Sequence, residues 1–171
     1  MNKKAVLMMS LILTVSMSGW TSVYGETSKT ATKPADTILA SPTPASIETS
    51  GQKVVTFAQE YIGTDYKYGG VTKDGFDASG FTKFVYKNSD AKMILERSVA
   101  AQFKQGQAIG SKSLKLGDLV FFKTDGKTAS LVGIYVGNNE FIAATTKGVR
   151  VQSLTTSYYK KAYLGAKRML K

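Results

Sequence analysis

The chain has 171 residues, with 23 Lys plus Arg against 12 Asp plus Glu and a formal net charge of +11. It contains no cysteine and no histidine. The composition therefore excludes disulfide bonds, thiol nucleophiles, imidazole bases and the Cys/His metal sites of zinc proteins within this chain.

Residues 1–25 have the pattern of a signal peptide. Lys3 and Lys4 precede an apolar run over 5–17, which is shorter than the ~20 residues of a membrane-spanning helix. We expect cleavage near Gly25, no stable membrane insertion, and a protein that is secreted or located in the cell wall. A retained membrane anchor is the alternative interpretation.

Residues 26–50 are rich in Ser, Thr, Ala and Pro and contain all three prolines of the chain. Few large apolar side chains are available there to offset the entropy lost on ordering, so a disordered linker is predicted. Residues 51–171 are numerous enough to form one compact domain.

The predicted domain is basic in its own right. Residues 51–171 contain 19 Lys plus Arg and 9 Asp plus Glu, a balance of +10. An exported domain of this charge is expected to attract polyanions such as teichoic-acid-like wall polymers. A solvated lysine-rich surface is the alternative interpretation. Nucleic acid is not expected as a partner, because no helix shows clustered arginines at a base-reading spacing.

Helical signals come first along the domain. Apolar residues at helical spacing predict a helix over about 52–62, ended by Gly63. A glycine-rich loop follows over 66–75. A second helix is expected to begin at Asp77, whose carboxylate can cap its first turn. Ser98 can cap a short third helix that runs through Phe103 and is closed by Gly106.

Strand signals follow from residue 115 onward. Short β-branched and aromatic segments cover 118–123, 131–136, 140–144, 149–154 and 163–169, separated by turn residues. Val149 and Val151 alternate with Arg150 and Gln152, which predicts one buried face. The order of elements indicates an α+β fold, with the N-terminal helices packed on one side of an antiparallel sheet of about five to six strands.

Several segments resemble, in order and spacing, those of the NlpC/P60 (peptidase C40) cell-wall peptidases. The resemblance covers residues 53–170 and implies a papain-like fold. The matching segments are Tyr66-Lys-Tyr-Gly-Gly70, Gly75-Phe-Asp77, Arg97-Ser-Val-Ala-Ala-Gln102, Leu116–Phe122, Ser130–Gly137, Phe141-Ile-Ala143, 158–163 and Gly165–Arg168. One departure is Glu96, where the family usually has proline.

The resemblance also implies a catalytic set that this chain lacks. Active members of the family cleave peptidoglycan stem peptides with a cysteine at a helix N-terminus, a histidine base and a third polar residue that orients the base. The matching positions here are Ala78, Leu131 and Ala143. The side chains at these positions can neither attack a carbonyl nor carry a proton, so a catalytically inactive member is predicted.

Other residues offer little replacement chemistry. Ser79 follows the vacant nucleophile position, but a first-turn serine more often hydrogen-bonds to the backbone. Asp77 and Asp118 could suggest a carboxylate pair, but they are more simply a helix cap and a turn residue. No metal site and no cofactor are expected, because the carboxylates are scattered along the sequence.

The groove of the family is the part expected to survive. The resemblance assigns Tyr66, Asp77, Ser79, Arg97 and Ser98 to its lining, where they would offer hydrogen bonds and a cation to an anionic peptide. The alternatives are half-buried packing for Tyr66 and a structural ion pair for Arg97. Leu131 can also pack against Ala78 and close the groove.

These observations support three functional hypotheses. The first is a secreted, inactive NlpC/P60-like domain that binds peptidoglycan stem peptides or anionic wall polymers and regulates an active wall hydrolase. The second is an active endopeptidase with an unrecognised nucleophile. The third is a protein-binding inhibitor or effector that uses the remodelled groove, which a long exposed apolar patch around Leu131 and Ala143 would favour.

Overall fold

The computed structural model describes residues 49–171. The predicted signal peptide and residues 26–48 of the predicted linker lie outside the described residues. Over residues 49–171, no helix combines the length and the apolar character needed to cross a bilayer.

Three helices precede most of the sheet, and a polar side chain caps each of them. Helix α1 (Ser50–Gln59) is capped by Thr49, α2 (Ala78–Asn88) by Asp77 and α3 (Val99–Lys104) by Ser98. Each cap accepts a hydrogen bond from a first-turn amide that has no partner within its helix. The caps at Asp77 and Ser98 are those predicted. Helix α1 ends earlier than expected, because the backbone tightens into i to i+3 turns after Gln59.

The main sheet has six antiparallel strands in the order β3-β8-β4-β5-β6-β7. Strands β4 to β7 form the predicted meander, and β8 returns to pair with β4. A separate two-stranded hairpin, β1 (Val71–Thr72) and β2 (Gly75–Phe76), precedes α2. The strands of the main sheet are β3 (Gln107–Ile109), β4 (Leu119–Phe122), β5 (Leu131–Gly137), β6 (Glu140–Thr145), β7 (Gly148–Ser153) and β8 (Tyr163–Arg168).

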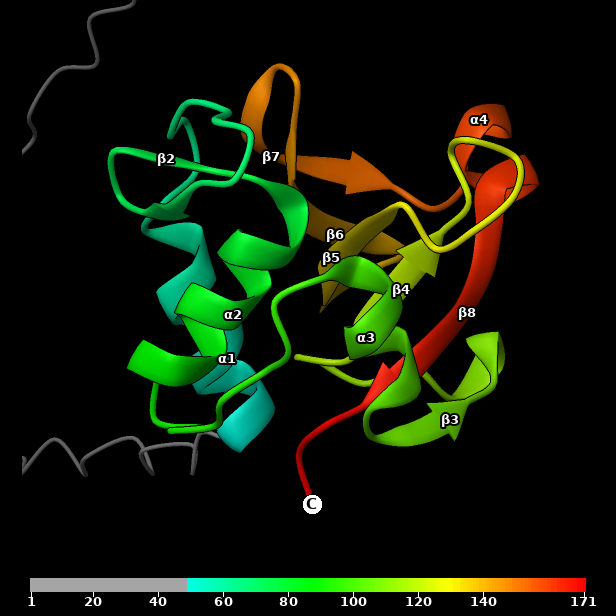
Figure 1. Ribbon diagram of the computed structural model, residues 1–171. Helices are drawn as coiled ribbons and strands as arrows, with labels where there is room; N and C mark the ends of the chain where they lie inside the picture. The colour runs from blue at the N-terminus through cyan, green and yellow to red at the C-terminus, as the bar shows by residue number, and fades with distance from the viewer. Residues whose placement is uncertain (1–48) are drawn as a thin grey trace, which may run out of the picture. The chain divides into compact units, whose positions relative to one another are not determined.

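Helices cover both faces of this sheet. Helices α1 and α2 lie together on one side (Figure 1), where Val54 and Phe81 belong to the same buried cluster as Ile134. The second cluster forms around α4 (Ser157–Ala162) and joins Tyr159 to Phe122 and neighbouring aromatic side chains. The predicted packing of the N-terminal helices on one side of the sheet is confirmed, and α4, which was not predicted, packs on the other side.

The structure differs from the sequence analysis at two places. Helix α4 was not predicted, although Thr156 caps it by accepting a hydrogen bond from the Tyr159 amide at 3.4 Å. Val149 is buried as expected, but Val151 is 42% exposed because β7 is an edge strand of the sheet. The alternation of apolar and polar residues therefore predicted burial of both valines, whereas only Val149 is buried.

Candidate functional site

A cleft of about 920 Å³ opens beside the N-terminus of α2. Its walls come from the loop before the β1–β2 hairpin, the start of α3, the beginning of β5 and the β6–β7 hairpin. All five predicted lining residues contribute to it. Those residues are Tyr66, Asp77, Ser79, Arg97 and Ser98.

Asp77 organises the floor of this cleft. Its Oδ1 accepts a hydrogen bond from the Gly80 amide at 2.7 Å, which caps α2, and its Oδ2 accepts one from the Gly69 amide at 3.0 Å. The same carboxylate therefore holds the 66–70 loop against the helix. This loop carries Tyr66 and Tyr68 to the edge of the cleft.

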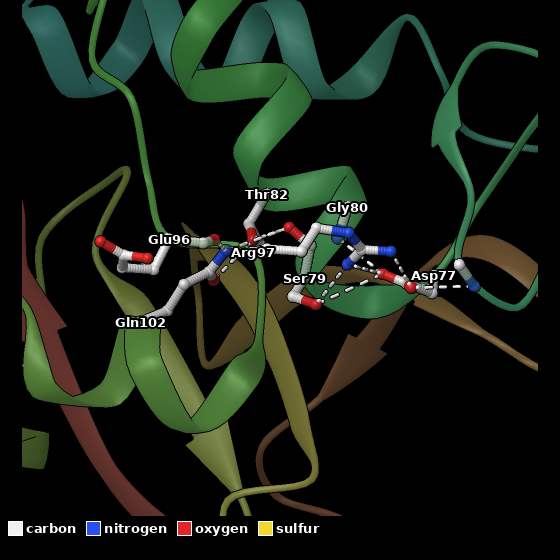
Figure 2. Close-up of polar contacts among 8 residues, drawn as sticks. Asp77, Ser79, Gly80, Thr82, Glu96, Arg97 and Gln102 are labelled. Carbon is white, nitrogen blue, oxygen red and sulfur yellow. Dashed lines mark hydrogen bonds and ion pairs between the residues drawn. The ribbon is translucent and has the colours of Figure 1, made fainter.

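Arg97 reaches across from the α3 side and pairs with the same carboxylate (Figure 2). Its Nη2 lies 2.5 Å from Asp77 Oδ2 and its Nη1 lies 3.0 Å from Oδ1, which is a bidentate pairing. Nη1 also donates to Ser79 Oγ at 3.0 Å. The guanidinium is therefore already paired with a carboxylate of the protein.

The pairing changes the acidity of Asp77. Burial alone would raise the pKa of this carboxyl, but the Arg97 hydrogen bonds, the Gly80 amide and the guanidinium charge outweigh it. The pKa of Asp77 lies below its ordinary value as a result. An ionised carboxylate of lowered pKa is a poor general base near neutral pH.

Gln102, which the sequence did not single out as functional, holds α3 against α2. It is fully buried, and its Nε2 donates to the carbonyl oxygens of Ser79 (3.0 Å) and Glu96 (2.8 Å). Thr82 donates to Gln102 Oε1 at 2.8 Å, so both ends of the amide are bonded (Figure 2). The sequence signal for this role was a glutamine at the position of a short helix that faces the core.

The positions matched to the family nucleophile and base lie in one cleft. Ala78, the first residue of α2, and Leu131, the first residue of β5, both line it. Ala143 does not line it. It is fully buried and belongs, with Leu131, to the cluster around α4.

The opposite wall carries polar groups that the predicted site did not include. Lys147, Arg150, Gln152 and Tyr158 come from the β6–β7 turn, β7 and α4. The alternation of Arg150 and Gln152 along the predicted strand was the signal for this wall, although it was used only to predict burial. Among the cleft-lining residues, three are cationic and Asp77 is the single carboxylate.

Asp118 has no place in the cleft. It is a turn residue as predicted, since its Oδ2 accepts a hydrogen bond from the Lys115 amide, but it is also a buried ion-pair partner. Arg168 donates Nε to its Oδ1 at 2.8 Å and Nη2 to its Oδ2 at 2.7 Å. Asp77 and Asp118 therefore do not form a carboxylate pair. Within residues 49–171, no three Asp or Glu side chains gather as a metal site would require.

The sequence profile of the NlpC/P60 family matches residues 63–168. This chain belongs to the NlpC/P60 family. It is 44% identical over 116 residues to the probable peptidoglycan endopeptidase LytE of Bacillus subtilis, covering 68% of this chain and 34% of LytE. The chain thus spans about a third of that relative.

Solved structures agree with the family assignment. An NlpC/P60 family protein from Bacillus cereus superposes with a TM-score of 0.67 at 30% identity, covering 72% of this chain and 41% of that protein. RipD of Mycobacterium tuberculosis, described as a non-catalytic NlpC/p60 domain protein adapted to peptidoglycan binding, gives a TM-score of 0.60 at 22% identity. That match covers 71% of this chain and 98% of RipD, and at this identity it supports the fold alone.

Proposed function

We propose that this chain is an exported, non-catalytic NlpC/P60 domain that holds peptidoglycan stem peptides in its cleft. One observation carries the proposal: a single cleft is lined by Ala78 and Leu131, the positions that the family resemblance assigns to the nucleophile and the base. With no cysteine or histidine anywhere in the chain, the chemistry of the family has no thiol and no imidazole to use. A cleft without that chemistry can bind a peptide without cutting it.

The charges of the cleft favour a ligand that carries carboxylates. Arg97 is engaged by Asp77, so we assign it to organising the floor of the cleft. Lys147 and Arg150 form no ion pair with any carboxylate among residues 49–171 and face the same space. They are the cations that can meet the carboxylates of a stem peptide.

The hypothesis of a replacement nucleophile has little support in the geometry. The Ser79 side chain is buried, donates to Asp77 at 3.3 Å and accepts a hydrogen bond from Arg97. A guanidinium at its oxygen cannot take its proton, and the nearby carboxylate is a weak base. Serine activation requires an adjacent general base of suitable pKa.

The hypothesis of a protein-binding module is also weakened. An exposed apolar patch around Leu131 and Ala143 would have favoured it, but Ala143 is fully buried and Leu131 is half-buried beside polar cleft residues. The proposal includes one form of regulation, the shielding of stem peptides from an active wall hydrolase, because a peptide held in the cleft is not available for cleavage.

The decisive experiment measures binding and cleavage on the same material. Purified protein is mixed with a soluble stem peptide for calorimetry and with purified walls for release of muropeptides. We expect binding without release. We also expect Arg150→Glu to weaken peptide binding about tenfold, since it reverses a cleft cation, whereas Lys87→Glu on exposed α2 surface leaves it unchanged. Peptide cleavage that disappears in Ser79→Ala would overturn the proposal.

Restoration of the reactive groups tests whether the cleft still fits a substrate. Ala78→Cys places a thiol at the N-terminus of α2, where unpaired amides favour the thiolate, and Leu131→His returns a base to the same cleft. We expect the double variant to release muropeptides slowly, with either single variant inactive. Export is tested separately, because an N-terminus at Glu26 in protein recovered from the medium or the wall would match the predicted cleavage.

A further inference from the structure

The positive charge of the domain is not evenly distributed. Residues 51–96, which include α1 and α2, contain six basic and six acidic side chains. Residues 97–171, which include the main sheet, contain thirteen basic and three acidic ones. The entire excess charge of the domain therefore belongs to the part of the chain that builds the sheet. An excess of charge does not define a binding site unless a cavity or groove lies among the charged side chains.

A second cavity, separate from the cleft, lies in this part of the domain. This cavity of about 540 Å³, here called the α4 pocket, is formed by the short helix η1 (Ser111–Ser113), the end of β5, the segment after β7, and α4. Leu114 and Leu154 supply its apolar lining and belong to the core cluster around α4. It shares no lining residue with the cleft, and no carboxylate lines it.

Two lysines reach this pocket from distant parts of the sequence. Lys112 comes from η1 and Lys160 from α4, and both are exposed. Neither has a carboxylate within ion-pair distance among residues 49–171. Two unpaired cations beside a cavity can both approach a single anionic group without first breaking an ion pair.

Tyr163 adds a directional donor. Tyr163 is one of the residues that line the same pocket, and its hydroxyl is buried and has no hydrogen-bond partner among the described residues. A buried polar group without a partner is costly, so such groups usually meet a ligand or an ordered water. Burial, with a smaller effect from the Asp118 charge, raises the pKa of Tyr163, so the hydroxyl keeps its proton and can donate.

We propose that the α4 pocket binds a phosphate group of a phosphodiester-linked polyol polymer of the cell wall. Lys112 and Lys160 flank the phosphate oxygens, the Tyr163 hydroxyl donates to one of them, and the leucines contact the polyol carbons. A polymer fits better than an isolated phosphate, because residues 97–171 carry ten more basic than acidic side chains, which can attract further phosphates of the same polymer. The inference rests on the proposed function only in taking the wall as the location of the domain.

The test uses the exported chain with soluble poly(glycerol phosphate) as the probe. Lys112→Glu with Lys160→Glu is compared with Lys73→Glu with Lys87→Glu, which makes the same charge change on exposed sites in residues 51–96. We expect the first pair to weaken binding about thirtyfold or more, since each cation near a polyanion contributes roughly fivefold, and the control pair to have a much smaller effect.

Tyr163→Phe separates the pocket from general charge attraction. It removes only the hydroxyl, so the thermal midpoint should stay the same or rise, while polymer affinity falls about fivefold. Equal weakening by both lysine pairs, with no effect of Tyr163→Phe, would show diffuse charge attraction and overturn the proposal. Binding to anionic lipid vesicles but not to poly(glycerol phosphate) would overturn it as well.

Stem-peptide affinity, measured on the same variants, keeps the two proposals separate. The α4 pocket variants should leave peptide binding in the cleft unchanged. If the unsubstituted chain binds the polymer but no stem peptide, the proposed function alone is rejected. If it binds the stem peptide but not the polymer, this inference alone is rejected.

Discussion

Replacing Arg97 by methionine should destabilise the domain in a pH-dependent manner. The change removes three hydrogen bonds, two to Asp77 and one to Ser79, and keeps most of the apolar stem. Hydrogen bonds to charged groups contribute about 1.5–3 kcal/mol when well buried. The Arg97 side chain is 43% exposed and that of Asp77 is 16% exposed, so solvent screening lowers our expectation to about 1–2 kcal/mol for the whole set.

The pH dependence has a definite sign. Because the folded pKa of Asp77 is lowered, its ionised form stabilises the fold above the unfolded pKa of about 3.9, and this contribution is lost as pH falls through the folded value. Arg97→Met removes the main groups that lower this pKa. The stability difference between the two proteins should therefore be full at pH 7 and shrink below about pH 4.

Urea unfolding at pH 7 and near pH 3 measures this difference. Arg150→Met is the matched control, because Arg150 is exposed, lines the same cleft and forms none of the ion pairs found in residues 49–171. It should cost less than about 0.5 kcal/mol. A loss from Arg97→Met that is equal at both pH values, or matched by the control, would refute the ion-pair reasoning.

Three further substitutions test the core by urea unfolding. Arg168→Leu leaves the buried Asp118 carboxylate without its cation and should cost about 3–5 kcal/mol, part of which Asp118→Asn in the same chain should recover. Tyr86→Phe removes the buried hydroxyl that donates to the Gly117 carbonyl and should cost about 1–3 kcal/mol. Gly80→Ala would place a methyl carbon 2.0 Å from a backbone carbonyl oxygen of the neighbouring loop, so we expect a loss of about 1–3 kcal/mol. A fully tolerated Gly80→Ala would mean that the loop moves away from α2 at little cost.

Local signals explain which parts of the fold were predictable. Asp77 and Ser98 could be assigned as caps because capping depends on residues within one helical turn. The meander from β4 to β7 followed from alternating strand and turn composition, since each strand pairs with the next. Strand β3 has three residues at a sheet edge and offers too short a pattern to recognise.

Long-range pairing explains what was not predictable. The Asp118–Arg168 pair joins residues 50 positions apart, and the Asp77–Arg97 pair joins residues 20 positions apart. No periodicity relates such partners, so the sequence left Arg97 open between a ligand contact and an ion pair. The α4 pocket was missed for the same reason, because its two lysines meet only after η1 and α4 have packed against the sheet.

The loss of reactive groups also changes where binding energy can arise. In this cleft the α2 N-terminus receives its negative charge from Asp77, and Arg97 balances that charge, so the floor near Ala78 offers hydrocarbon to a bound peptide. Under the proposed function, affinity for a stem peptide would then come from the walls, chiefly from the aromatic side chain of Tyr68, which is 91% exposed, and from the cation of Arg150. A few such contacts give weak binding to one peptide. A cell wall presents many copies of the same peptide, and a second site on the same domain would make rebinding effectively intramolecular. Under the two proposals, weak recognition at each site would therefore be sufficient for retention on a wall, and it would leave the domain free to move between peptides.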